Sequence, residues 1–165
     1  MARRLVLMRH AKSDWANHNL ADHDRPLNER GRLSATQMAK HFANTDLAPS
    51  VIIASTAARV RETLTRMLAE WPYEPEVSFE QSLYLASVET LNARVCGLHH
   101  AWQSAMIVGH NPGLADFVSR LANRPLEMPT AAVAVFSTNL ETWTDAVAAR
   151  DWQLTAHWRP RDLFE

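Results

Sequence analysis

Four residues, Arg9, His10, Arg59 and His110, have side chains suited to nucleophilic attack and to binding an anion. A neutral imidazole is a good nucleophile near pH 7, and a guanidinium is a permanently charged planar fork that matches phosphate oxygens. Taken singly, each residue is ordinary, because histidines and arginines at strand ends are usually packed or solvated. Their positions relative to the predicted strands make the set of four a candidate site.

Phosphate would have to be held mainly by side chains. The sequence has four glycines, and they form neither the glycine-rich dinucleotide fingerprint nor a P-loop. No His-Glu-x-x-His motif is present, and the single cysteine excludes a cysteine-rich zinc site. We therefore expect no metal and no cofactor.

Three short apolar runs position the candidate residues. Residues 4–8, 51–54 and 106–108 are typical of strands buried on both faces. Helical patterns separate them, which predicts parallel strands. Ligands of such sheets bind at the carboxyl ends of the strands, where all four candidates would converge.

The helical patterns cover residues 28–44, 60–71, 91–102 and 112–121, with Asn28 and Asn111 as predicted N-caps. Residues 131–138 predict a further strand. The alternation over residues 152–158 predicts another, at or near a sheet edge. The expected fold class is α/β: a three-layer α/β/α single domain over residues 1–165, with a mostly parallel central sheet and an antiparallel strand near its edge.

Composition limits the classes of partner. Hydrophobic residues make up 47% of the 165 and charged residues 21%, as in globular proteins. The net charge of −1 predicts no nucleic-acid or membrane-surface binding, and no apolar run is long enough to span a bilayer. Cys96 alone cannot form an intrachain disulfide, and the N-terminus lacks the apolar region of a secretory signal. We therefore expect a cytoplasmic protein.

Four motifs, in order, resemble those of the histidine phosphatase (phosphoglycerate mutase-like) superfamily, branch 1. They are Arg-His-Ala-Lys-Ser at 9–13, Arg-Pro-Leu-Asn-Glu-Arg-Gly at 25–31, Ser-x-x-x-Arg-x-x-Glu-Thr at 55–63, and Gly-His-Asn-Pro-Gly at 109–113. The resemblance covers roughly residues 4–123. The short chain and its first motif are similar to the small phosphohistidine phosphatases of the SixA type.

The resemblance implies a phosphoglycerate mutase-like fold and a covalent phosphohistidine intermediate. His10 would be the nucleophile, while Arg9, Arg59 and His110 would bind the phosphate and stabilise its transferring oxygens. Arg25 lies in the second motif and either adds charge to the phosphate site or forms a structural ion pair with a neighbouring aspartate.

Glu80 is the candidate for a leaving-group acid, because family members that cleave phosphate esters often use a carboxylic acid from this segment. The motif around Glu80 does not closely resemble that version, and a surface carboxylate is the alternative. Phosphohistidine has a better leaving group than an alkoxide and needs less acid help. That difference favours phosphohistidine as substrate.

The primary hypothesis is a metal-independent phosphatase whose substrate is a phosphorylated protein, for example a histidine-containing phosphotransfer domain. A phosphatase for small phosphate monoesters is the alternative within the enzymes. A noncatalytic phosphate-binding module is the alternative of another class. The sequence identifies neither the physiological substrate nor the oligomeric state.

Overall fold

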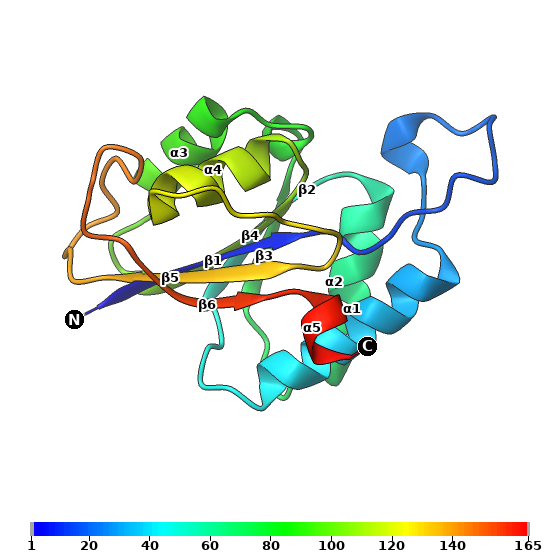
Figure 1. Ribbon diagram of the computed structural model, residues 1–165, viewed down its shortest axis with the longest axis horizontal. Coiled ribbons are helices and arrows are strands. Elements are labelled where there is room, and N and C mark those ends of the chain that lie inside the picture. The colour runs from blue at the N-terminus through cyan, green and yellow to red at the C-terminus, as the bar shows by residue number, and fades with distance from the viewer. Residues whose placement is uncertain (1, 165) are drawn as a thin grey trace.

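Six strands form one sheet in the order β3-β2-β4-β1-β5-β6 (Figure 1). The computed structural model describes residues 2–164. The strands are β1 (Arg3–Arg9), β2 (Val51–Ser55), β3 (Glu76–Glu80), β4 (Ser104–Gly109), β5 (Val133–Thr138) and β6 (Gln153–Trp158). The α-helices are α1 (Glu29–Ala43), α2 (Ala58–Glu70), α3 (Val88–Cys96), α4 (Gly113–Ala122) and α5 (Pro160–Leu163), and two 3₁₀ turns are η1 (Asp22–Asp24) and η2 (Gln81–Leu83).

The sheet is mixed in the way that the sequence predicts. Strands β1, β2, β3 and β4 are parallel to one another. Strand β5 pairs antiparallel with β1, and β6 pairs antiparallel with β5 at the edge. The α/β class with a mostly parallel sheet is confirmed.

Helices cover both faces of the sheet, so the central strands are buried on both sides. On β1, Leu5 and Leu7 pack with the side chains of α3 and α4, whereas Val6 and Met8 pack with those of α1 and α2. Figure 1 shows α3 and α4 on one side of the sheet and α1 on the other. This two-sided burial explains why β1 is a continuous apolar run. Within residues 2–164, no helix has the length and apolar character to cross a membrane.

Helices α3 and α4 have boundaries that differ from the sequence prediction. Helix α3 ends at Cys96 instead of continuing to Trp102, and Gly97 is its C-cap. Helix α4 begins at Gly113, one residue later than predicted, and Pro112 is its N-cap. The Asn111 side chain still contributes, because its Oδ1 accepts the N–H of Ala115 at 3.2 Å.

Strand β3 was not predicted from the sequence. This edge strand has five residues, begins and ends with glutamate, and none of its side chains is fully buried. Strand β3 is stabilised by its pairing with β2. That pairing is a tertiary contact, so the local sequence pattern does not predict it.

The topology places the ends of β1, β2 and β4 together. Arg9 is the register partner of Gly109, and Ala54 is the partner of Val108. The segments after these strands therefore leave the sheet at one edge, and residues 10, 56 and 110 begin there.

A close backbone contact fixes the start of α4 beside this edge. A methyl group on Gly113 would lie 1.8 Å from the carbonyl oxygen of Ala86, so only glycine fits without a backbone shift. We predict that Gly113→Ala lowers the free energy of unfolding by about 1–3 kcal/mol, as overpacking does.

The matched control is Gly97→Ala, where the new methyl would lie 3.5 Å from its nearest neighbour at a negative φ. Urea denaturation followed by circular dichroism measures both changes. Equal stability of Gly113→Ala and wild type would show that the contact at Ala86 does not constrain the fold.

Candidate active site

A cavity of about 300 Å³ opens at the carboxyl edge of the parallel strands. It brings together all four residues that the sequence singles out, and Arg25 as well. Its lining consists of Arg9, His10, Lys12, Ser13, Trp15, Arg25, Arg59, Leu85, His110, Asn111 and Thr130. Within residues 2–164, no carboxylate lines this cavity, so cations and neutral donors dominate it.

His10 follows β1 and is held in one orientation. Its backbone N–H donates to the carbonyl of Gly109 at 3.2 Å, and its ring is 5% exposed. The ring Nδ1 lies 2.7 Å from the carbonyl oxygen of Ala11. Because a carbonyl only accepts, Nδ1 carries the proton in the neutral ring and Nε2 carries the lone pair.

Arg59, in the first turn of α2, contacts both histidines. Its Nε donates to Nε2 of His10 at 3.3 Å, and its Nη2 donates to Nδ1 of His110 at 3.3 Å. The side chain is 4% exposed. One buried guanidinium thus spans the two imidazoles, whose ring centroids are 5.2 Å apart.

Ser55 sets the orientation of His110. With Nδ1 of His110 accepting from Arg59, the ring proton lies on Nε2, which donates to Oγ of Ser55 at 2.8 Å. Ser55 is fully buried at the end of β2, and its Oγ also accepts the N–H of Ala57. The serine therefore shapes the turn into α2 and positions His110.

Burial keeps both imidazoles neutral at pH 7. Desolvation, with a contribution from the charge of Arg59, lowers the pKa of His10 to about 4. Desolvation, followed by the charges of His10 and Arg59, lowers the pKa of His110 to about 3. The nucleophilic lone pair of His10 is thus available over the physiological pH range.

Arg9 has an unpaired donor. It ends β1, and its Nη1 donates weakly to the carbonyl of Met128 at 3.4 Å. Its Nε is buried and has no hydrogen-bond partner among the described residues. Burial and the neighbouring Arg59 also lower the pKa of Arg9. A half-buried cation whose buried Nε has no partner is stabilised by an anion in the cavity.

Arg25 combines the two roles that the sequence left open. It lines the cavity, yet its Nη2 is 3.0 Å from Oδ1 of Asp22 in an ion pair. Its Nη1 donates to Oγ of Ser13 at 2.7 Å, and its guanidinium stacks over the ring of Trp15 at 3.4 Å. These contacts hold a third, buried arginine in the wall of the cavity.

The sequence indicated Asp22 only as a possible ion-pair partner of Arg25, and the structure shows that it also contacts Arg59. One carboxylate oxygen accepts from Arg25, and the other accepts from Nη2 of Arg59 at 3.1 Å and from the hydroxyl of Tyr84. The Tyr84 hydrogen bond, followed by those from the arginines, holds the pKa of this carboxyl well below its usual range. Asp22 is therefore ionised and ties the two arginines together. Only its spacing from Arg25 was visible in the sequence, since Arg59 lies 37 residues away.

The structure does not bring Glu80 into the cluster. Its two carboxylate oxygens accept from Nε and Nη2 of Arg94 on α3, at 2.7 and 2.9 Å. This pairing lowers the pKa of Glu80, whereas a general acid needs a raised pKa. Glu80 thus lies outside the cavity in an ion pair, and its role as general acid stays a prediction that this geometry does not favour.

No metal-binding arrangement accompanies the cluster. In the part of the chain that the structure describes, no three or more His, Cys, Asp or Glu side chains group closely enough to hold an ion. The arrangement that the cavity does offer is a fixed imidazole lone pair surrounded by guanidinium groups. That arrangement suits an electrophilic anion such as a phosphoryl group.

Comparison with known proteins agrees with this geometry. The family model of the histidine phosphatase superfamily (branch 1) matches residues 5–83, which include three arginines of the site and His10. An uncharacterized chloroplastic protein of Arabidopsis thaliana is 31% identical over 157 residues, covering 90% of this chain and 72% of the relative.

Two solved structures show the same architecture. A SixA protein from Agrobacterium tumefaciens has a TM-score of 0.83 at 28% identity, covering 96% of this chain and 98% of its own. A SixA protein from Nakamurella multipartita, also at 28% identity, has a TM-score of 0.85 and covers 97% of both chains. From its sequence and its fold, the chain belongs to branch 1 of the histidine phosphatase superfamily, with an architecture of the SixA type.

Proposed function

We propose that this protein is a metal-independent phosphatase that hydrolyses protein phosphohistidine through a covalent intermediate on His10. The observation that carries the proposal is the contact of Nδ1 of His10 with the carbonyl oxygen of Ala11. This contact keeps the proton on Nδ1, so Nε2 of the neutral ring has its lone pair in a cavity lined by three arginines. Similarity to two SixA proteins, both named as putative phosphohistidine phosphatases, supports the substrate class.

In the first step, Nε2 of His10 attacks phosphorus, and the bond from phosphorus to the leaving group breaks as the new P–N bond forms. The electron pair of the broken bond goes to the substrate imidazole, whose other ring nitrogen carries a proton, so that the ring leaves as neutral histidine. In the free protein Arg59 donates to Nε2 of His10. When the phosphoryl group is bound, the same guanidinium donates to the phosphoryl oxygens instead. Arg9 adds its unpaired Nε. Both guanidinium groups stabilise the charge that spreads over the equatorial oxygens.

In the second step, a water molecule attacks the phosphoryl group, and the electrons of the P–N bond return to Nε2 of His10. Inorganic phosphate leaves, and the surplus proton of the water passes to solvent. A phosphoryl dianion in the cavity favours protonation of His110, whose Nδ1 then donates to an equatorial oxygen. Ser55 keeps that ring in place through its contact with Nε2.

The lining of the cavity favours phosphohistidine over alkyl phosphates. An alkoxide leaves poorly without a proton donor, and within residues 2–164 no carboxyl group lines the cavity. Glu80, the sequence candidate for that acid, is paired with Arg94. Imidazole is a better leaving group, so phosphohistidine can be cleaved with less acid assistance.

Removing the nucleophile tests the catalytic role of His10. We predict that His10→Ala lowers turnover by more than about 10⁴-fold, the scale that loss of a nucleophile produces. Vanadate binding, measured by calorimetry, should persist because three arginines and His110 remain around the cavity.

His100→Ala is the matched control, because His100 is exposed and lies outside the cavity. It should keep wild-type turnover. Wild-type-like turnover by His10→Ala would assign the nucleophile elsewhere.

The lowered pKa of His10 predicts a measurable titration. In the free protein, the His10 ring should titrate at about pH 4 by NMR, while an ordinary histidine titrates near 6.5. Between those values the unfolded chain binds more protons than the folded one, so acidification from pH 6.5 to 4 should reduce stability.

The variant His10→Gln should lose part of that pH dependence of the free energy of unfolding. Urea titrations at a series of pH values measure it. A His10 midpoint near 6.5 would contradict the desolvated, neutral nucleophile.

Substrate class is tested by leaving groups of different basicity. We predict that kcat/KM for a phosphohistidine peptide exceeds that for glycerol phosphate by about 10²-fold or more, because general acid assistance is worth about 10²–10⁴-fold. p-Nitrophenyl phosphate, whose leaving group departs without a proton, should fall between them.

Equal kcat/KM for glycerol phosphate and the peptide would favour a phosphatase for small monoesters. Phosphate binding without turnover of any substrate would indicate a noncatalytic phosphate-binding module.

A further inference from the structure

A second hollow adjoins the catalytic cavity. It has a volume of about 230 Å³ and shares two lining residues, Lys12 and Thr130, with the cavity. The residues that line it are Lys12, Arg30, Ser34, Pro129, Thr130, Pro160 and Arg161. We refer to this set as the basic groove.

The antiparallel half of the sheet places the basic groove beside the site. Strand β5 runs opposite to β1, so β5 begins at the catalytic edge, where Ala131 donates its N–H to the carbonyl of His10. Strand β6 runs opposite to β5 and ends at Trp158, the partner of Val133. Helix α5 therefore starts at the catalytic edge, next to the first turns of α1 (Figure 1).

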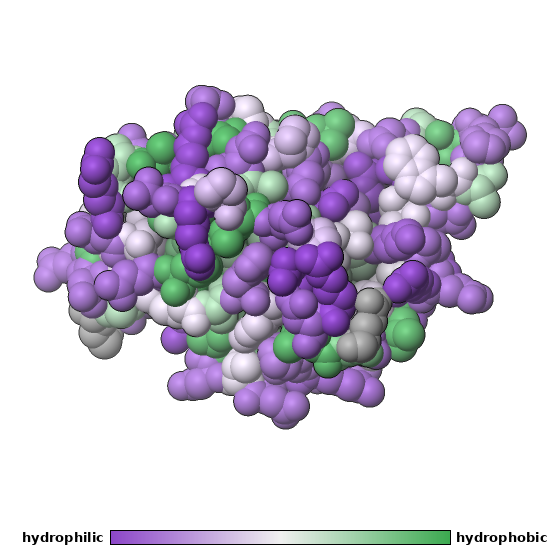
Figure 2. Space-filling view, viewed as in Figure 1, coloured by the Kyte–Doolittle hydropathy of each residue, from purple (hydrophilic) through white to green (hydrophobic). Residues whose placement is uncertain are grey.

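The basic groove is cationic although the protein as a whole is nearly neutral. Lys12, Arg30 and Arg161 are exposed, and within residues 2–164 no carboxylate lines the groove. Figure 2 shows strongly hydrophilic side chains gathered over α5. Arg161 has an ion pair with Glu127 at 3.6 Å, but both side chains are more than half exposed, so this pair is worth little. A carboxylate from a ligand can compete for Arg161.

We propose that the basic groove binds an acidic side chain of the phosphoprotein substrate while the phosphohistidine occupies the catalytic cavity. This inference rests on the proposed function. A guanidinium binds a carboxylate through two parallel hydrogen bonds, and the hydroxyls of Ser34 and Thr130 are further donors. Lys12 lies between the two sites and faces both anions. The groove thereby selects phosphohistidines that have an acidic neighbour.

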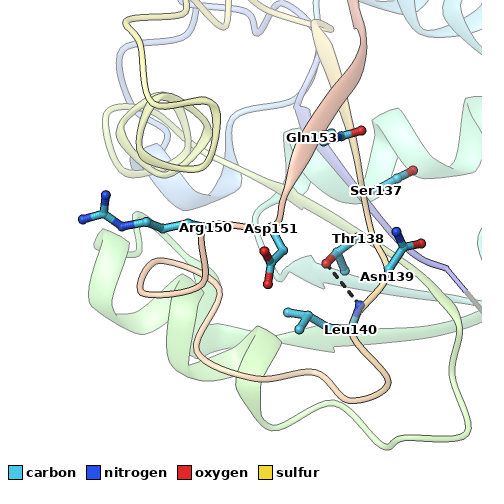
Figure 3. Close-up of a pocket in the computed structure, with 7 residues that line it drawn as sticks. All are labelled: Ser137, Thr138, Asn139, Leu140, Arg150, Asp151 and Gln153. Atoms are coloured by element: carbon cyan, nitrogen blue, oxygen red, sulfur yellow. Dashed lines mark hydrogen bonds between the residues drawn. The ribbon is translucent and has the colours of Figure 1, made fainter.

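A hollow at the opposite end of the sheet provides a matched control. It has a volume of about 390 Å³ and lies where β5 ends and β6 begins, away from the catalytic edge. Arg150 lines it and points outward, while Asp151 contributes a carboxylate (Figure 3). Arg150 is exposed like Arg161, but the hollow that it lines shares no residue with the catalytic cavity.

The test compares synthetic phosphohistidine peptides in which one Glu is moved along the sequence, with matched Gln and Lys peptides. At low salt, kcat/KM for the best Glu peptide should exceed that of its Gln counterpart by about 3- to 10-fold, through KM with kcat unchanged. The Lys counterpart should be the poorest substrate. Added salt should reduce the difference.

Variants assign the preference to the basic groove. Arg161→Gln should remove most of the advantage of the Glu peptide and leave kcat/KM for the Gln peptide unchanged. Arg161→Glu should reverse the order and favour the Lys peptide. Arg150→Gln should retain the wild-type preference.

The outcomes separate this inference from the proposed function. If no peptide is dephosphorylated, the proposed function fails. If wild type cleaves the Glu, Gln and Lys peptides equally, the proposed function stands and the basic groove has no role in selection. A preference that survives in Arg161→Gln would place the acidic contact elsewhere. An Arg161-dependent preference for small bisphosphates, with none among peptides, would assign the groove to a second phosphate.

Discussion

The buried guanidinium of Arg59 holds the site together. It donates to His10, to His110, and to both the carboxylate and the backbone carbonyl of Asp22. The parallel sheet brings His10 and His110 to one edge, and the loop after β1 adds Asp22. A charge that is 4% exposed is stable only with such partners, so the loop that carries Asp22 is part of the structure of the site.

The same burial determines the electrostatics of the cavity. It lowers the pKa of both histidines, which removes positive charge from the rings and leaves it on the arginines. One donor of Arg9 stays unpaired, and Asp22 neutralises the outer side of Arg25 and Arg59. The interior of the cavity therefore combines a neutral nucleophile with fixed cationic donors. In the proposed reaction, these donors stabilise the transferring phosphoryl group without a metal ion.

The sequence predicted the features that depend on local pattern and order. Apolar runs predicted the central strands, and their ends predicted that Arg9, His10, Arg59 and His110 would meet. It could not predict the contact of Asp22 with Arg59 or the true partner of Glu80, because both depend on loop geometry and on contacts between distant segments. Strand β3 was missed for a similar reason, since its half-exposed side chains carry little periodic signal. The basic groove depends on where α5 starts, which follows from the antiparallel pairing of β5 and β6.

The central claim is that Nε2 of His10 becomes covalently bonded to phosphorus. Rapid quenching of the wild-type enzyme with a phosphohistidine peptide labelled in its phosphoryl group, followed by peptide mapping under alkaline conditions, tests it directly. The account predicts a transient label on His10 that forms and decays at rates consistent with turnover. A label on His110 alone, or turnover at the wild-type rate with no label on the enzyme, would contradict it.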